Sequence, residues 1–222
     1  GMTTSRNGQP APAGCAKPQS ARATEQLFLL DGPSLRPGAW PWGELRPSAY
    51  GLIMADPPWR FEHYSERGEA KSPQAKYRTM TLDEIAALPV AELAAPDCLL
   101  WLWTTAAGIL AQAPVAERWG FRIATTGVWV KRTRATDKLG FGTGYVLRNA
   151  HEPFVIATRG APDLSRAVRS VVEGRLGRHS EKPDEAFAAA ERLCPGVARL
   201  ELFARRRRSG WDAWGDEVEE GT

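Results

Sequence analysis

The stretch "YGLIMADPPWR", residues 50–60, decides the fold, because an apolar run ends there on an aspartate and two prolines. The run does not alternate between apolar and polar side chains, which is typical of a strand covered on both faces of a sheet. Proline fixes φ and has no backbone N–H, so Pro57 and Pro58 end the strand. The sequence therefore predicts a buried strand followed directly by a stiff turn that holds Asp56 and Trp59.

Further apolar runs along the chain have the same character, and helical patterns separate most of them. The predicted strands cover residues 50–55, 98–104, 121–130, 153–158 and 198–204. The predicted helices are "TLDEIAAL" with a capping box between Thr81 and Glu84, "AAGILAQAPVAERWG" with a break at Pro114, and "PDEAFAAAERLCPG" with Pro183 in its first turn. Strands that alternate with helices predict a doubly wound α/β fold: three αβα layers around a mostly parallel central sheet.

The length of the chain suits one domain with short tails. With 222 residues and 43% hydrophobic side chains, it is long enough to bury one α/β core. Residues 1–25 are polar and rich in small residues and proline, which predicts a disordered N-terminal tail. We expect a single domain over residues 26–218 and a short tail over 219–222.

Cysteine usage, hydropathy and net charge narrow the class of protein. Cys15, Cys98 and Cys194 are far apart and odd in number, which fits neither a disulfide framework nor a zinc site. We therefore expect no metal and a reducing, cytoplasmic setting. No apolar stretch approaches the roughly 20 residues of a membrane span, so no membrane partner is expected. The formal net charge of +3 does not by itself indicate a nucleic-acid partner.

The residues after the first strand suit one particular chemistry. In doubly wound sheets, ligands bind beyond the carboxyl ends of the strands, and Asp56 lies at that point. An exocyclic amine of a base is a poor nucleophile unless acceptors on its N–H bonds orient its lone pair. Asp56 and the carbonyl of Pro57 can be those acceptors, held by Pro58 and the stiff turn, while Trp59 offers a face on which the base stacks. A base reaches such a site only when it is flipped out of a duplex or is single-stranded already. The alternative is that Asp56 only initiates a turn, with the two prolines ending the strand and Trp59 capping the core.

The sequence around this motif resembles the MT-A class of adenine-N6 methyltransferases, which includes enzymes acting on messenger RNA and on bacterial and phage DNA. Four blocks carry the resemblance in the same order: "MADPPW" (54–59), "YRTMTLDEI" (77–85), "GTGYVLRNAHEPFVIATRG" (142–160) and "SEKPDEAFAAAERLCPGVARLELFARRRRSGWDAWGDE" (180–217). The resemblance implies a Rossmann-like methyltransferase fold with circularly permuted motif order. It also implies S-adenosylmethionine as the cofactor.

Residue by residue, the resemblance implies a cofactor site near the C-terminus. Lys182 matches a lysine near the cofactor carboxylate, and Phe203 and Arg205 match the cofactor strand. Asp216 and Glu217 match positions around the ribose, where family members often carry Asn-Gln instead. A lysine and an arginine suit a carboxylate, and acidic side chains suit hydroxyl groups.

The resemblance also implies residues on the substrate side of the site. Tyr77 begins the block that resembles a loop closing over the site. Glu152, beside His151, lies near the catalytic motif by the same resemblance, and a purely structural role in bracing that loop is the alternative.

A basic, glycine-rich stretch is the candidate for contacts with a phosphate backbone. Lys131, Arg132, Arg134 and Lys138 gather in "KRTRATDKLGFGTGYVLR" after a predicted strand. A second basic set lies in residues 67–78. The alternative is that both are ordinary solvated loops.

The function predicted from these features is S-adenosylmethionine-dependent methylation of adenine N6 in nucleic acid, with DNA favoured over RNA. One alternative is a non-catalytic nucleic-acid-binding subunit of the same family, against which the intact acceptors of Asp56 and Pro57 argue. Another is an unrelated α/β enzyme, against which the other three blocks argue. The sequence leaves the oligomeric state open, with a homodimer or a heterodimer among the alternatives.

Overall fold

The computed structural model describes residues 1, 40–60, 79–142, 144, 146–177, 181–215 and 218. The candidates Tyr77, Asp216 and Glu217 lie outside these residues, as do the basic set of residues 67–78 and, apart from Gly1, the predicted N-terminal tail. The described residues from 40 onward belong to one compact unit. The division into one domain and two tails stays a prediction.

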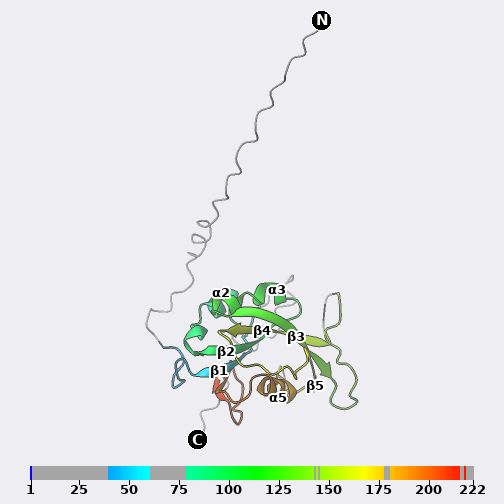
Figure 1. Ribbon diagram of the computed structural model, residues 1–222. Helices are drawn as coiled ribbons and strands as arrows, with labels where there is room; N and C mark the ends of the chain where they lie inside the picture. The colour runs from blue at the N-terminus through cyan, green and yellow to red at the C-terminus, as the bar shows by residue number, and fades with distance from the viewer. Residues whose placement is uncertain are drawn as a thin grey trace. The chain divides into compact units, whose positions relative to one another are not determined.

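A seven-stranded sheet with the order β5-β3-β4-β2-β1-β6-β7 forms the centre of the described fold (Figure 1). The strands are β1 (Tyr50–Ala55), β2 (Ala94–Trp103), β3 (Arg122–Arg132), β4 (His151–Arg159), β5 (Val171–Arg175), β6 (Arg199–Leu202) and β7 (Asp212–Trp214). Neighbouring strands are parallel except where β4 pairs with β2 and β3. Within the described sheet, β4 therefore runs against all the others, and the predicted mostly parallel sheet is confirmed.

All of the strands predicted from apolar runs are present, and β1 has the predicted bounds. Two short strands, β5 and β7, were not predicted. The sequence of β5, "VVEGR", alternates between exposed and buried positions over few residues, and β7 has only three residues. Both lie at the edges of the sheet, where fewer side chains need to be apolar.

Helices lie within all three stretches predicted from sequence, although they are shorter than those stretches. The helical elements are α2 (Leu82–Ala86), the 3-10 turn η2 (Val90–Glu92), α3 (Ile109–Gln112), α4 (Val115–Arg118) and α5 (Asp184–Leu193), of which η2 was not predicted. The capping box of α2 forms as predicted, with Glu84 N–H donating to Thr81 Oγ1 at 3.2 Å and Thr81 N–H to Glu84 Oε2 at 2.7 Å. Pro114 separates α3 from α4, and Pro183 precedes α5 as its N-cap.

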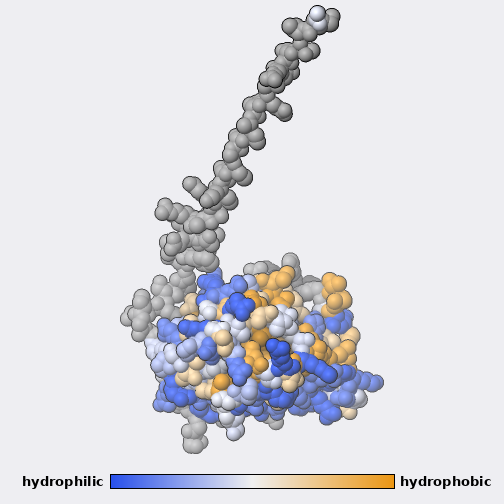
Figure 2. Space-filling model, in the orientation of Figure 1, coloured by the Kyte–Doolittle hydropathy of each residue, from blue (hydrophilic) through white to orange (hydrophobic). Residues whose placement is uncertain are grey.

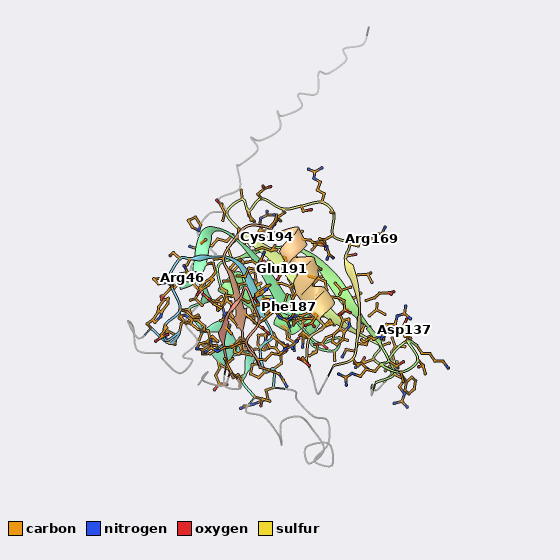
Figure 3. The ribbon with its side chains drawn as sticks, turned by 90° about the horizontal axis from the view of Figure 1, so that it is seen from below. Arg46, Asp137, Arg169, Phe187, Glu191 and Cys194 are labelled. Atoms are coloured by element: carbon orange, nitrogen blue, oxygen red, sulfur yellow. The ribbon has the colours of Figure 1, made fainter. Side chains whose placement is uncertain are left out.

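Helices cover both faces of the sheet, which confirms the three-layer arrangement. On one face, Ile53 of β1 and Leu100 of β2 pack with α2 and α4 in one core cluster. On the other face, Leu52 and Leu99 pack with Phe187 of α5 in a second cluster. Figure 3, seen from the α5 side, shows Phe187, Glu191 and Cys194 along this helix where it crosses the sheet. Because both faces of the central strands β1, β2 and β4 are covered, these strands are buried except near their ends, and the site forms at one of those ends.

In the part of the chain that the structure describes, no helix is both long enough and apolar enough to cross a lipid bilayer.

Candidate active site

Asp56 lies at the carboxyl end of β1, and backbone hydrogen bonds fix the turn that follows it. The N–H of Trp59 donates to the carbonyl of Pro57 at 2.8 Å, which closes a tight turn around Pro58. The N–H of Met80 donates to the carbonyl of Pro58 at 2.8 Å, and the N–H of Arg60 donates to the carbonyl of Met80 at 2.9 Å. The turn is thus held to the segment before α2, as expected of a stiff motif.

Trp59 is buried beneath this turn, and only 5% of its surface is exposed. Its Nε1 donates a hydrogen bond to the carbonyl of Trp103, the last residue of β2, at 3.1 Å. The indole belongs to the core cluster on the α2 and α4 face. Little of the ring is therefore open to a stacked base, unlike the stacking face expected from the sequence. The contacts of Trp59 instead tie the turn to the end of β2.

A chain of buried ion pairs connects Asp56 to β4 and β3. Lys182 Nζ lies 2.7 Å from Asp56 Oδ2 and 2.6 Å from Glu152 Oε1, and its side chain is only 8% exposed. Lys131 Nζ lies 2.9 Å from Glu152 Oε2. Glu152 reaches this edge because β4 is reversed, so its first residues lie beside the last residues of β2 and β3. We call Asp56, Lys182, Glu152 and Lys131 the ion-pair chain.

The two carboxylates of this chain are not equally compensated. Glu152 contacts both Lys182 and Lys131, whereas Asp56 contacts Lys182. Burial raises the pKa of Asp56, the Lys182 ammonium opposes this rise, and the nearby Glu152 carboxylate adds to it. Glu152 is also buried, but Lys182 and Lys131 both contact it and hold its pKa below the ordinary value. Burial alone would lower the pKa of Lys182, but the two carboxylates raise it. The Glu152 carboxylate is therefore firmly ionised, whereas Asp56 is the carboxyl that takes up a proton more readily.

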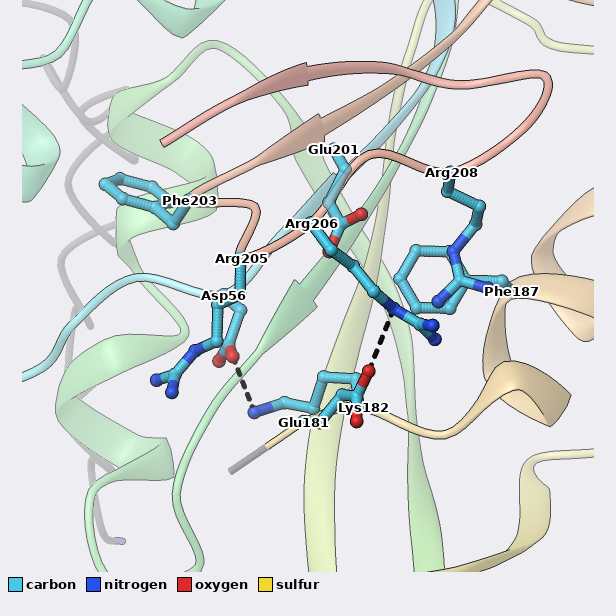
Figure 4. Close-up of a pocket in the computed structure, with 9 residues that line it drawn as sticks. All are labelled: Asp56, Glu181, Lys182, Phe187, Glu201, Phe203, Arg205, Arg206 and Arg208. Carbon is cyan, nitrogen blue, oxygen red and sulfur yellow. Dashed lines mark hydrogen bonds and ion pairs between the residues drawn. The ribbon is translucent and has the colours of Figure 1, made fainter. Parts of the chain in front are cut away.

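A pocket adjoins Asp56 on the side of β6 (Figure 4). Its lining comes from the end of β1, the start of α5, β6 and the segment after β6. The lining residues are Asp56, Glu181, Lys182, Phe187, Glu201, Phe203, Arg205, Arg206 and Arg208. The structure thus brings the predicted Lys182, Phe203 and Arg205 together around one cavity with Asp56.

Glu201 is a pocket residue that was not predicted from the sequence. Its Oε2 is buried and has no hydrogen-bond partner within the described part of the chain. Burial raises the pKa of Glu201 to about 7, against an opposing effect of Arg208. The signal was present in the sequence, because Glu201 is the single charged residue within the apolar run "LELFA" (200–204).

Three of the four arginines after β6 line the same pocket: Arg205, Arg206 and Arg208. Arg206 Nε lies 2.8 Å from Glu181 Oε1, an ion pair drawn in Figure 4. Arg208 NH1 lies 2.7 Å from Asp184 Oδ1, and its guanidinium carbon lies 3.6 Å from the ring centroid of Phe187. These contacts fix one wall of the pocket against the first turns of α5.

The residues predicted to contact phosphates fall into two groups. Lys131 belongs to the ion-pair chain, and Arg132 pairs with Glu173 of β5 at 3.1 Å. Arg134 and Lys138 are exposed in the loop after β3, and no carboxylate among the described residues pairs with them. No cluster of potential metal ligands occurs in the described ranges.

A mostly parallel αβα sheet, with an Asp-Pro-Pro-Trp turn at the carboxyl end of an interior strand and a charged pocket beside it, defines a Rossmann-like methyltransferase fold. Comparison with known protein families identifies the particular family within this class. The MT-A70 family model matches residues 50–217, so the chain belongs to the MT-A70 family.

Individual relatives agree with the family. The chain is 30% identical to the type II methyltransferase M.MunI of Mycoplasma sp over 188 residues, which cover 76% of this chain and 78% of M.MunI. It is 31% identical to an N(6)-adenosine-methyltransferase MT-A70-like protein of Arabidopsis thaliana over 173 residues, 76% of this chain and 24% of that protein. It is 27% identical to the human N(6)-adenosine-methyltransferase catalytic subunit METTL3, covering 77% of this chain and 28% of METTL3. The chain thus spans about a quarter of the plant and human relatives and most of M.MunI.

Proposed function

We propose that this protein transfers a methyl group from S-adenosylmethionine to adenine N6 in nucleic acid, with DNA as the first candidate. The observation that carries this proposal is the Asp56 carboxylate, held by Lys182 at the carboxyl end of β1 and open to a charged pocket. DNA comes first because the type II methyltransferase M.MunI is matched along most of its own length. The N(6)-adenosine-methyltransferase relatives make RNA the second candidate.

The pocket suits the charged groups of S-adenosylmethionine. A buried carboxylate oxygen without a donor, as at Glu201, favours a ligand that brings hydroxyl or ammonium groups. Arg205 and Lys182 lie where a ligand carboxylate needs cations. The Lys182 ammonium has three N–H donors, of which Asp56 and Glu152 take two, so the third is available to that carboxylate. When bound, the cofactor supplies an electrophilic methyl group.

Asp56 and Pro57 would orient the amine of the base. Because Lys182 holds Oδ2 of Asp56, Oδ1 remains to accept one N–H of the adenine amine. The Pro57 carbonyl uses one lone pair for the Trp59 N–H, and its second lone pair can accept the other N–H. With both N–H bonds engaged, the nitrogen lone pair would be free to face the methyl group. The new N–C bond would replace the bond between the methyl carbon and sulfur, S-adenosylhomocysteine would leave, and the amine would lose a proton that Asp56 Oδ1 can accept.

The decisive experiment incubates the protein with methyl-labelled S-adenosylmethionine and, separately, duplex DNA, single-stranded DNA and RNA. Digestion to nucleosides and mass spectrometry then identify the modified base. We expect N6-methyladenine in DNA. Label found only in RNA would replace DNA by RNA as the substrate, and no label in any nucleic acid would overturn the proposal.

Cofactor binding is tested separately from turnover. S-adenosylmethionine should raise the Tm, because it binds only the folded state, and Arg205→Ala should reduce this shift. Arg46→Ala is the matched control, since Arg46 is exposed, pairs with Asp212 and lies outside the pocket. Equal shifts in both variants and the parent would remove Arg205 from the cofactor site.

A further inference from the structure

The loop of residues 133–150, between β3 and β4, exposes an unusual set of apolar side chains. Phe141, Val146 and Leu147 are 79%, 94% and 78% exposed, and Leu139 is 55% exposed. Single exposed apolar residues are normal on a protein surface, but a group in one short loop indicates contact with another molecule. Figure 2 shows apolar and hydrophilic side chains side by side on the right-hand side of the molecule, where Figure 1 shows this loop projecting.

Backbone hydrogen bonds within the loop hold it as a folded arm. The N–H of Gly140 donates to the carbonyl of Lys131 at 2.6 Å, and that of Gly142 donates to the carbonyl of Asn149 at 2.9 Å. A Cβ on Gly142 would lie 2.7 Å from the Asn149 oxygen, so this close approach requires glycine. These two hydrogen bonds fix the described backbone around Phe141 to the end of β3 and to the segment before β4.

The loop leaves and rejoins the sheet at the edge where Asp56 lies. It begins after Arg132, and it returns into β4 at His151, whose neighbour Glu152 contacts the Lys182 that holds Asp56. In Figure 3, Asp137 of this loop lies well away from α5, toward the periphery of the molecule. A molecule that reaches Asp56 from this side would pass along the loop.

Charge favours a nucleic acid over a second copy of the protein as the molecule that contacts this loop. Arg134, Lys138 and Arg148 are exposed around the apolar side chains, and none is ion-paired within the described ranges. The Arg148 guanidinium lies 5.5 Å from the Phe141 ring centroid, so cation and apolar surface adjoin directly. Two copies that met through this loop would bring like charges together. Phosphates on either side of a base step would pair with these cations while an apolar side chain entered the stack.

We propose that the loop is a wedge that enters a nucleic-acid duplex and fills the space left by the flipped adenine, so that the substrate is double-stranded. The proposal rests on the function proposed above, because the base displaced by the wedge is the one that enters the site at Asp56. Unstacking a base costs a few kcal/mol, and inserted apolar side chains offset part of this cost in proteins that kink DNA. A single-stranded substrate would not require the wedge.

The test compares two substrates in one triple variant, Phe141→Ser/Val146→Ser/Leu147→Ser. We expect methylation of native duplex DNA to fall at least tenfold while methylation of heat-denatured DNA stays within twofold of the parent. Leu110→Ser is the matched control, because Leu110 is 91% exposed on α3 and lies outside the loop. Unchanged activity on duplex DNA, or an equal loss on both substrates, would overturn the wedge.

A second measurement does not depend on methyl transfer. An inserted side chain unwinds DNA, so a closed circular plasmid relaxed by topoisomerase in the presence of the parent protein should have a lowered linking number. The triple variant should leave the linking number unchanged, and absence of unwinding by the parent would overturn the wedge. Unwinding without any methyladenine would instead overturn the proposed function alone. Light scattering completes the test, since a parent dimer that the triple variant turns into a monomer would make the loop a protein interface.

Discussion

The two sides of the candidate active site differ in how their charges are satisfied. In the ion-pair chain, Lys182 bridges Asp56 and Glu152, so oppositely charged groups are in contact before any ligand arrives. On the β6 side, the buried Oε2 of Glu201 has no described partner. The first side is thus arranged in advance, as the proposed electrostatic catalysis requires, whereas Glu201 leaves the second side with an acceptor that a ligand donor could satisfy.

The largest expected effect comes from Asp56, at the end of the ion-pair chain. Asp56→Ala should reduce methyl transfer at least about a hundredfold, because an oriented acceptor at the reacting amine is lost. The protein should stay folded, since Lys182 keeps its contact with Glu152. Asp56→Asn keeps an acceptor without the charge and should retain residual activity. Rates from labelled cofactor and circular dichroism of each variant measure both effects.

Asp83→Asn is the control for this prediction, because Asp83 is exposed and pairs with Arg118 at the surface. If Asp56→Ala transferred methyl groups at the rate of the parent, the ion-pair chain would serve the fold alone.

Lys182→Met tests whether the ion-pair chain is also a structural unit. Removing the shared cation leaves Glu152 with Lys131 alone and takes from Asp56 the lysine that separates it from Glu152, which should lower the free energy of unfolding by roughly 3 kcal/mol. Adding Glu152→Gln should recover part of this loss, since one of the two carboxylates is then neutral. Urea denaturation of the single and double variants gives both values. A single variant as stable as the parent would mean that water or rearrangement solvates these carboxylates.

Glu201 allows a test of the β6 side of the site through the pH dependence of the free energy of unfolding. Burial raises its pKa from 4.5 to about 7, so the folded protein favours the protonated form. Its contribution to stability is fully present below pH 4.5 and is lost as the pH rises to about 7. The free energy of unfolding of the parent should therefore fall over this range by an amount that Glu201→Gln removes, on the order of 2 kcal/mol.

Urea denaturation of parent and variant between pH 4 and 8 measures this difference. Glu92→Gln, at an exposed position of η2, is the matched control. A constant difference between Glu201→Gln and the parent across the range would show that Glu201 is not strained by burial.

The smallest effect is expected in the phosphate contacts of the loop. Arg134 is exposed and unpaired in the described structure, so Arg134→Ala should reduce the slope of log Kd against log salt by about 0.9 for duplex DNA. Arg132 is already paired with Glu173, so Arg132→Ala should change the slope less. Fluorescence anisotropy at several salt concentrations measures both slopes. Equal slopes in the parent and both variants would confine DNA contacts to other parts of the site.

The sequence predicted the architecture well because buried strands and capped helices leave strong local signals. The apolar run of β1 and the capping box of α2 both appear where predicted. The direction of β4 was not predictable in this way, because an apolar strand has the same pattern in either direction. That direction decides where Glu152 lies, so the contact of Glu152 with Lys182 followed from tertiary structure alone.

The candidate site was predictable in part. Asp56 follows from its position after a strand, while Lys182, Phe203 and Arg205 were identified by family resemblance, and the structure gathers all four around one pocket. Spacing along the chain could not show that Lys182 contacts Asp56. Nor could it show that Trp59 is buried, because the packing of an aromatic side chain depends on neighbours distant in sequence.

The reversed strand β4 also makes the loop before it an exchangeable part. Because β3 and β4 are antiparallel neighbours, both ends of the loop are fixed by one ladder, in which the N–H of Lys131 donates to the carbonyl of Ala150 at 2.9 Å. Doubling the length of a flexible loop costs only about 0.6 kcal/mol in closure entropy. We therefore expect insertions and grafts here to leave the geometry of the sheet and of Asp56 unchanged. With the loop contacting nucleic acid as proposed, target choice could then diversify in evolution, or be redesigned, independently of the residues around Asp56.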